Sequence, residues 1–153
     1  MALRTPLYPI ISLFGALMVV ATFLTWASIE PIEGVEAGAA SVTGLDTSGW
    51  GAAAIVIGIA IFALGILGFV WNPFSDPEAV FIALFGLAAV VGSLVKIADT
   101  ASLLTGAEVF DFFDPSTSAG IGLWLVLVAG LASVLGAVWI LVSRPAAQTR
   151  LVS

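Results

Sequence analysis

The stretch WGAAAIVIGIAIFALGILGFVW, residues 50–71, decides how this chain folds, because no charged residue interrupts it. A helix needs about 20 mainly apolar residues to cross the hydrocarbon core of a bilayer. Tryptophan stands at both ends, at Trp50 and Trp71, as it does in the aromatic belts at membrane surfaces. The stretch therefore predicts a transmembrane helix.

Three further apolar stretches lie before and after this one, at about residues 7–26, 79–97 and 119–142. The only charge in them is Lys96, near the end of its stretch, and Ser118 is placed to cap the last helix. A cleaved secretory signal is the alternative for residues 7–26, but this apolar run is longer than a typical signal core. We expect four membrane-spanning helices in one domain that covers residues 1–153.

The composition supports a membrane protein and excludes several kinds of chemistry. Apolar residues make up 61% of the chain and charged residues only 9%, whereas soluble domains have about 25% charged residues. The chain has no His and no Cys, which excludes thiolate zinc sites, iron–sulfur clusters, disulfides and His-ligated haem. The net charge of −6 argues against nucleic acid as a partner. We expect no cofactor.

Positive charges in short loops indicate the orientation of membrane helices, because cytoplasmic loops hold an excess of Lys and Arg. Arg4, Arg144 and Arg150 lie on the side of both termini, and only Lys96 lies opposite. We therefore expect a plasma-membrane protein with both termini in the cytoplasm. Most of the ten acidic residues then lie in the two long outward-facing loops.

Shifting the chain by 71 residues aligns its two halves without a gap. The shift pairs IISLFGALMVV, residues 10–20, with FIALFGLAAVV, residues 81–91. Such a parallel repeat relates two helical hairpins by an axis along the membrane normal. The prediction is an all-α four-helix bundle made of repeat A, about residues 1–71, and repeat B, about residues 72–142, with a short cytoplasmic tail, residues 143–153.

Small residues form a stripe along one face of the second helix of each predicted hairpin. Its members are Gly51, Gly58, Gly65 and Gly68 in the first repeat and Gly122, Ala129 and Gly136 in the second. In lipid, helices associate through close van der Waals contact, which small residues permit. Packing inside this chain is the simpler interpretation. A docking face for another membrane helix or another copy is the alternative.

The outer loops contain two triplets of acidic residues at every third position, Glu30, Glu33 and Glu36 in the first loop and Glu108, Asp111 and Asp114 in the second. Calcium binds several carboxylate oxygens, so these residues are weak Ca²⁺ candidates. Neither triplet has the D-x-D-x-D-G pattern of a calcium loop. A solvated acidic surface is therefore the simpler interpretation.

The sequence offers no catalytic motif and no charge deep in a predicted span, where ion-moving proteins usually hold one. We therefore expect a non-catalytic multi-pass protein, a small accessory or structural subunit that packs against a larger membrane complex. Its partners would be the bilayer and other membrane helices or further copies of itself, with no small-molecule substrate identified. The alternative is a small oligomeric transport or permeation protein.

Overall fold

The computed structural model describes residues 4–29, 41–47, 49–71, 77–99 and 117–143, and most of this part is helical. The four helices are α1 (Arg4–Ala21), α2 (Trp50–Trp71), α3 (Pro77–Ala98) and α4 (Ile121–Val142). Three of them, α2, α3 and α4, are long and apolar enough to cross a membrane. The apolar part of α1, Leu7–Ala21, is shorter.

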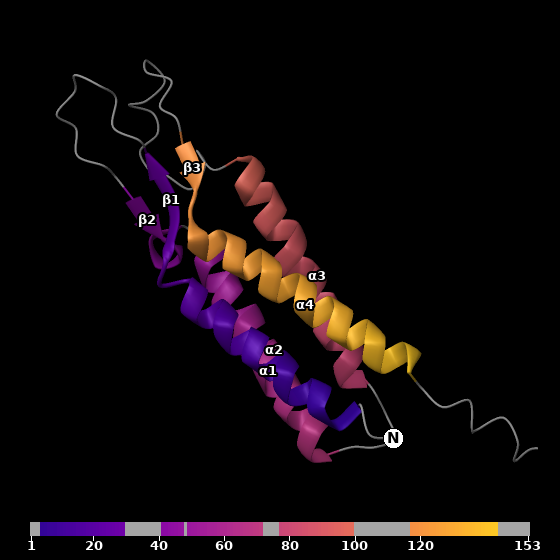
Figure 1. The fold of residues 1–153 in the computed structure, drawn as a ribbon. Helices are drawn as coiled ribbons and strands as arrows, with labels where there is room; N and C mark the ends of the chain where they lie inside the picture. Colours follow the sequence, from indigo (N-terminus) through magenta and orange to yellow (C-terminus); the bar gives the residue numbers. More distant parts are fainter. Residues whose placement is uncertain (1–3, 30–40, 48, 72–76, 100–116, 144–153) are drawn as a thin grey trace, which may run out of the picture.

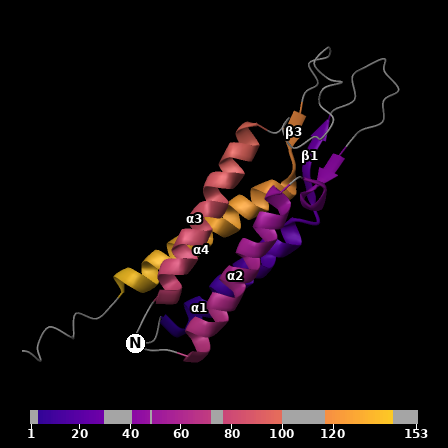
Figure 2. The ribbon, with the colours of Figure 1, turned by 180° about the vertical axis from the view of Figure 1, so that it is seen from behind.

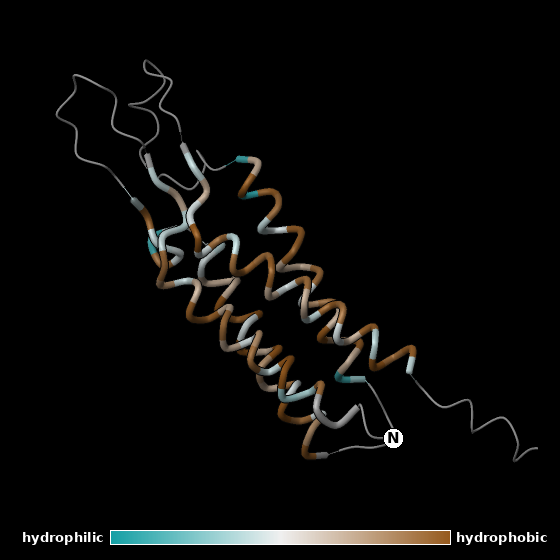
Figure 3. The backbone as a smooth tube through the Cα atoms, viewed as in Figure 1, coloured by the Kyte–Doolittle hydropathy of each residue, from teal (hydrophilic) through white to brown (hydrophobic). Residues whose placement is uncertain are grey.

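The four helices lie side by side, and consecutive helices run in opposite directions (Figure 1). Each helix packs against two others: α1 and α3 both contact α2 and α4. The view from behind shows the same arrangement, with α4 at an angle to α3 (Figure 2). Hydrophobic residues follow the helices along their whole length, whereas the end that carries the strands is paler in hydropathy (Figure 3).

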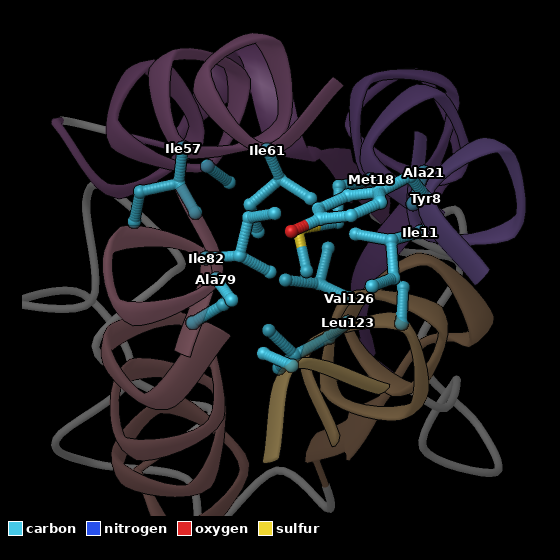
Figure 4. Close-up of a cluster of buried hydrophobic side chains, with 14 of the residues drawn as sticks. Tyr8, Ile11, Met18, Ala21, Ile57, Ile61, Ala79, Ile82, Leu123 and Val126 are labelled. Atoms are coloured by element: carbon cyan, nitrogen blue, oxygen red, sulfur yellow. The ribbon is translucent and has the colours of Figure 1, made fainter. Parts of the chain in front are cut away.

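The interior of the bundle is filled by apolar side chains from all four helices (Figure 4). Met18, Ile61, Ile82 and Val126 come one from each helix, and each is fully buried. Large apolar side chains also cover the outer surface. Leu13, for example, is 68% exposed. Apolar residues both inside and outside are typical of helices that meet lipid, because lipid tails are as apolar as leucine.

The expectation of a purely helical chain is corrected by a small sheet at one end of the bundle (Figure 1). Its strands are β1 (Thr25–Ile29), β2 (Ser41–Thr43) and β3 (Thr117–Ala119), in the order β2-β1-β3 and antiparallel throughout. A short 3₁₀ helix, η1 (Gly44–Asp46), follows β2. Beyond the helix ends the backbone still needs hydrogen-bond partners, and strand pairing supplies them.

The first helix ends at Ala21, five residues earlier than the predicted limit at residue 26. The backbone N–H groups that follow bond three residues back, as Thr22 does to the carbonyl of Val19 at 3.2 Å. The Thr22 hydroxyl donates to the same carbonyl at 2.7 Å. These bonds tighten and terminate the helix, and the chain then enters β1.

Contrary to the expectation from its position in the sequence, Ser118 does not cap the last helix. It lies in β3, where its hydroxyl is 2.9 Å from the hydroxyl of Ser28 in β1. The N-cap of α4 is Gly120, which has no side chain to offer.

The buried positions of the helices correspond along the sequence at two different offsets. Between α1 and α3 the offset is 71 residues, as in the buried pairs Ile11/Ile82 and Met18/Ala89. Between α2 and α4 it is 72 residues, as in the buried pairs Ala54/Val126 and Ile61/Ser133. An offset of 71 would instead relate the buried Gly68 to Trp139, which is 57% exposed. The repeat itself stays a prediction.

Candidate functional site

The sheet and η1 form a cap over one end of the bundle, and Trp26 of β1 lies at its centre. The Trp26 side chain is fully buried. Its indole Nε1 donates a hydrogen bond of 2.8 Å to the carbonyl of Ala21, the last residue of α1. Buried tryptophan usually pairs its N–H in this way. The bond fixes the direction in which β1 leaves the helix.

Two glycines from distant parts of the chain make room for the Trp26 indole. A Cβ added to Gly44 of η1 would lie 2.5 Å from Cε2 of the ring, and one added to Gly122 of α4 would lie 2.6 Å from Cδ1. The Gly120 N–H also donates to the Trp26 carbonyl at 2.8 Å. Trp26 therefore links the segment between α1 and α2 to the start of α4.

Thr47 fixes η1 on the first turn of α2. Its hydroxyl donates to the carbonyl of Gly44 at 2.6 Å and accepts from the backbone N–H of Gly51 at 3.2 Å. Gly51 lies so close to the carbonyl of Gly44 that an added Cβ would overlap it. Of the predicted helix-packing residues, Gly51 and Gly122 therefore contact the cap.

The turn between β2 and η1 contains a carboxylate held by two hydrogen bonds. Asp46 Oδ2 accepts from the backbone N–H of Thr43 at 3.0 Å and from its hydroxyl at 2.8 Å. These bonds, the backbone bond first, favour the charged form and lower the pKa of Asp46 below its ordinary value of 3.8. Asp46 is exposed, so it closes the turn without being buried in the cap.

The remaining predicted glycines of α2 lie in its seam with α1, the line along which the two helices touch. Gly58 lies against Gly15, where an added Cβ would be 2.8 Å from the Gly15 carbonyl. Further along, Gly65 faces Ser12 and Gly68 faces the ring of Tyr8. The Ser12 hydroxyl is 3.2 Å from the carbonyl of Phe62, also in α2, so the seam combines close contact with a hydrogen bond.

The seam between α3 and α4 depends on glycines that the predicted stripe does not contain. An alanine Cβ at Gly86 would lie 3.0 Å from the carbonyl of Gly130, and one at Gly130 would lie 3.1 Å from the carbonyl of Gly86. Of the predicted residues, Gly136 faces Ile11 of α1 and Ala129 is fully buried. Gly130 could have been found by sequence only with an offset of 72.

Three buried side-chain atoms have no hydrogen-bond partner in the part of the chain that the structure describes. They are Nε1 of Trp50, Oγ of Ser93 and Oε2 of Glu78. The equally buried hydroxyl of Ser133, by contrast, donates to the carbonyl of Ala129 in its own helix at 2.8 Å. The indole of Trp50, at the first turn of α2, lies directly against the backbone of Gly92 in α3.

The predicted calcium candidates, Glu30, Glu33, Glu36, Glu108, Asp111 and Asp114, lie outside the described residues. The calcium hypothesis is therefore untested. Within the described ranges, no group of three His, Cys, Asp or Glu residues is placed to hold a metal ion.

The described geometry thus consists of two close-packed helix seams and one cap fastened to three helices. Its polar groups serve mainly to fix the backbone, as those of Trp26, Thr47 and Asp46 do. The chain matches no known family model, no curated protein and no solved structure.

Proposed function

We propose that this chain is a non-catalytic multi-pass membrane protein, a small accessory or structural subunit that packs against a larger membrane complex. The observation that carries the proposal is the fastened cap. Strands from the segment between α1 and α2 and from the segment between α3 and α4 join one sheet at that end. Trp26 holds this sheet on α1 and α4. A rigid cap on an apolar bundle suits a protein that works by contact.

In this proposal all four helices cross the membrane. The 18 residues of α1 extend about 27 Å, against a hydrocarbon core of about 30 Å. The helix packs along α2 and carries lipid-type residues on its outer surface, including Val20 at 56% exposed. The turn after Ala21 adds Phe23, which is also exposed, so the apolar surface continues toward the cap.

The proposed topology has the cap outside the cell and both termini in the cytoplasm of a plasma-membrane protein. Three arginines of the sequence lie on the side of the termini and only Lys96 lies on the side of the cap, and cytoplasmic loops hold an excess of Lys and Arg.

The two-hairpin repeat is part of the same proposal, with one modification. Its support is that α1 meets α2 at Gly15 and Gly58 as α3 meets α4 at Gly86 and Gly130. Gly86 follows Gly15 by 71 residues and Gly130 follows Gly58 by 72. The proposed repeat therefore contains one extra residue between the two helices of the second hairpin.

The alternative function is permeation through an oligomer. A path through the centre of a single bundle would have to displace Met18, Ile61, Ile82 and Val126, which fill it. No such displacement is needed if solute passes between copies, so an oligomer is the form of this alternative that merits a test.

Purification of the full chain from its native membranes in mild detergent tests the proposal. Native mass spectrometry is expected to give a stoichiometric complex with at least one other polypeptide. A photo-crosslinking residue at Leu45 in the cap, or at Leu84 on the outer surface of α3, should attach that same polypeptide. Both positions are more than half exposed, at 52% and 57%. The buried Ile82 is the matched control and should give crosslinks only within the chain.

A chain that leaves native membranes alone, or only as copies of itself, would contradict the accessory role. Solute flux through liposomes that contain such a homo-oligomer would support permeation in its place.

A further inference from the structure

The cap is fastened to three helices of the bundle, and α3 is the fourth. Trp26 bonds to the end of α1, and Gly120 leads into α4. Gly44 of η1 lies against the first turn of α2. The helix α3 packs against α2 and α4. Its cap end, residues 92–98, therefore lies in two seams, one with each neighbour.

The seam with α2 closes over a polar group that has no partner. The indole of Trp50 lies directly against the backbone of Gly92. Its Nε1 is buried and has no acceptor among the described residues. The indole of Trp26, which is also buried, donates to the Ala21 carbonyl at 2.8 Å. Trp50 thus packs against α3 without the hydrogen bond that a buried tryptophan usually makes.

The seam with α4 closes over a second such group. Ser93 follows Gly86 by seven residues and Ala89 by four, so the three residues share one face of α3. Both Gly86 and Ala89 lie against Gly130 of α4. Ser93 is fully buried on this face, and its Oγ makes no hydrogen bond to any described residue.

Both groups lie close to the end of α3. Gly92 and Ser93 precede its last residue, Ala98, by six and five residues, which is about 8–9 Å along the helix. Buried polar groups are nearly always paired, and an unpaired one raises the free energy of the state that buries it. The end of a membrane helix reaches the head-group layer. Separation of α3 from its neighbours there would let both groups be solvated.

We propose that α3 has a second, open position, in which its cap end swings away from α2 and α4 about the contact between Gly86 and Gly130. In the open position the N–H of Trp50 and the hydroxyl of Ser93 bond to water or to lipid head groups. The structure described above is the closed position. Each group acts in its own seam, so the two need not share a partner.

The pivot follows from the packing of the rest of α3. A Cβ added to Gly86 would lie 3.0 Å from the carbonyl of Gly130, so the two backbones meet closely there. Between this contact and the start of α3, Ala79 and Ile82 are fully buried. This half of the helix stays in place, and the opening is confined to the end that carries the cap.

Double electron–electron resonance on the full chain in nanodiscs tests the proposal, since the chain has no native Cys. Spin labels on Phe23→Cys and Val95→Cys, both at exposed positions, measure the distance between α1 and α3 at the cap end. We expect two distance populations. Labels on Ile10→Cys and Val80→Cys, also exposed, are the matched control at the other end and should give one. A single population at the cap end would overturn the proposal. Two populations at both ends would contradict the pivot.

Two serine variants test the cause of the opening. Ser93→Ala removes the unpaired hydroxyl and should lower the ratio of open to closed chains by about fivefold or more. The matched control is Ser133→Ala, which removes an equally buried hydroxyl that bonds its own helix and should not shift α3 toward the closed position. A ratio that Ser93→Ala leaves unchanged would contradict the role of the unpaired group. The wild-type measurement decides whether α3 opens even if a variant fails to fold.

Discussion

Gly15→Ala should separate α1 from α2, although alanine is the better helix former. The added Cβ would lie 2.5 Å from the backbone nitrogen of Phe62 and 2.6 Å from the carbonyl oxygen of Gly58. Non-bonded carbon atoms are comfortable at about 3.5–4.0 Å, so the two backbones must move apart by about 1 Å. Neither obstacle is a flexible side chain that could turn away.

The expected cost follows from two opposing effects. Overpacking of this kind destabilises by about 1–3 kcal/mol. Alanine recovers about 1 kcal/mol relative to glycine inside a helix. The net loss is therefore up to about 2 kcal/mol. The hydrogen bond from Ser12 to the Phe62 carbonyl, 3.2 Å long, lies on the same seam and should lengthen as the helices separate.

Gly136→Ala is the matched control, because it makes the same change inside another helix. Its added Cβ would lie 3.0 Å from Cδ1 and Cγ1 of Ile11, side-chain atoms that need to shift by only a few tenths of an ångström, whereas the atoms that oppose Gly15 belong to the backbone. This variant has the same gain in helix propensity at a smaller steric cost and should be clearly more stable than Gly15→Ala.

The free energy of unfolding is measured by SDS titration in mixed micelles, with circular dichroism as the signal. If Gly15→Ala proves as stable as Gly136→Ala, the distance between α1 and α2 is not limited by Gly15, and the reasoning fails.

Three further predictions concern the cap and the topology. Trp26→Phe should destabilise the cap by about 2 kcal/mol through a lost hydrogen bond and a small cavity, and amide exchange in β1 measures this loss. Trp124→Phe is the control, because the Trp124 side chain is 47% exposed, and it should change the stability of the cap little. Because the pKa of Asp46 is lowered, its contribution to stability is present at neutral pH and is lost as pH falls below about 4. The protection factors of the β2 amides, corrected for the intrinsic exchange rate at each pH, should fall there, and Asp46→Asn should remove that fall. The chain has no native Cys, so an impermeant thiol reagent on intact cells should label Ser118→Cys and spare Ser143→Cys; the reverse pattern would invert the topology.

The helices were predictable because their signal is local. Residues 50–71 form one uninterrupted apolar stretch, and α2 begins and ends at the two tryptophans that bound it. The end of α1 was misjudged because Trp26 resembles a residue of the aromatic belt. Its buried position requires Gly44 and Gly122, which lie far from it in sequence. The sheet likewise joins segments that lie far apart in the sequence. Its strands also have only three to five residues, which is too short for a clear local pattern.

The buried positions of α4 correspond to those of α2 at an offset one residue longer than the predicted repeat, although Gly122 and Ala129 of the predicted stripe are buried as well. The sequence pairs Gly51 with Gly122, whereas the buried positions correspond at an offset of 72. One residue turns a helix by about 100°. That rotation places Trp139 on the outer surface, buries Ile140 and brings Gly130 against α3. Matching letters cannot distinguish the two offsets, because glycine and alanine are frequent along the whole helix.

The order of strands in the sheet has a consequence for the synthesis of the chain. β1 is the central strand, and its pairing through Ser28 reaches Ser118, 90 residues later. A growing chain therefore exposes one edge of β1 until α3 has been inserted and β3 has left the ribosome. Open edges pair readily with other chains. Closure of the sheet on this side therefore waits for residues 117–119, and a chain interrupted before residue 117 would keep that edge of β1 open.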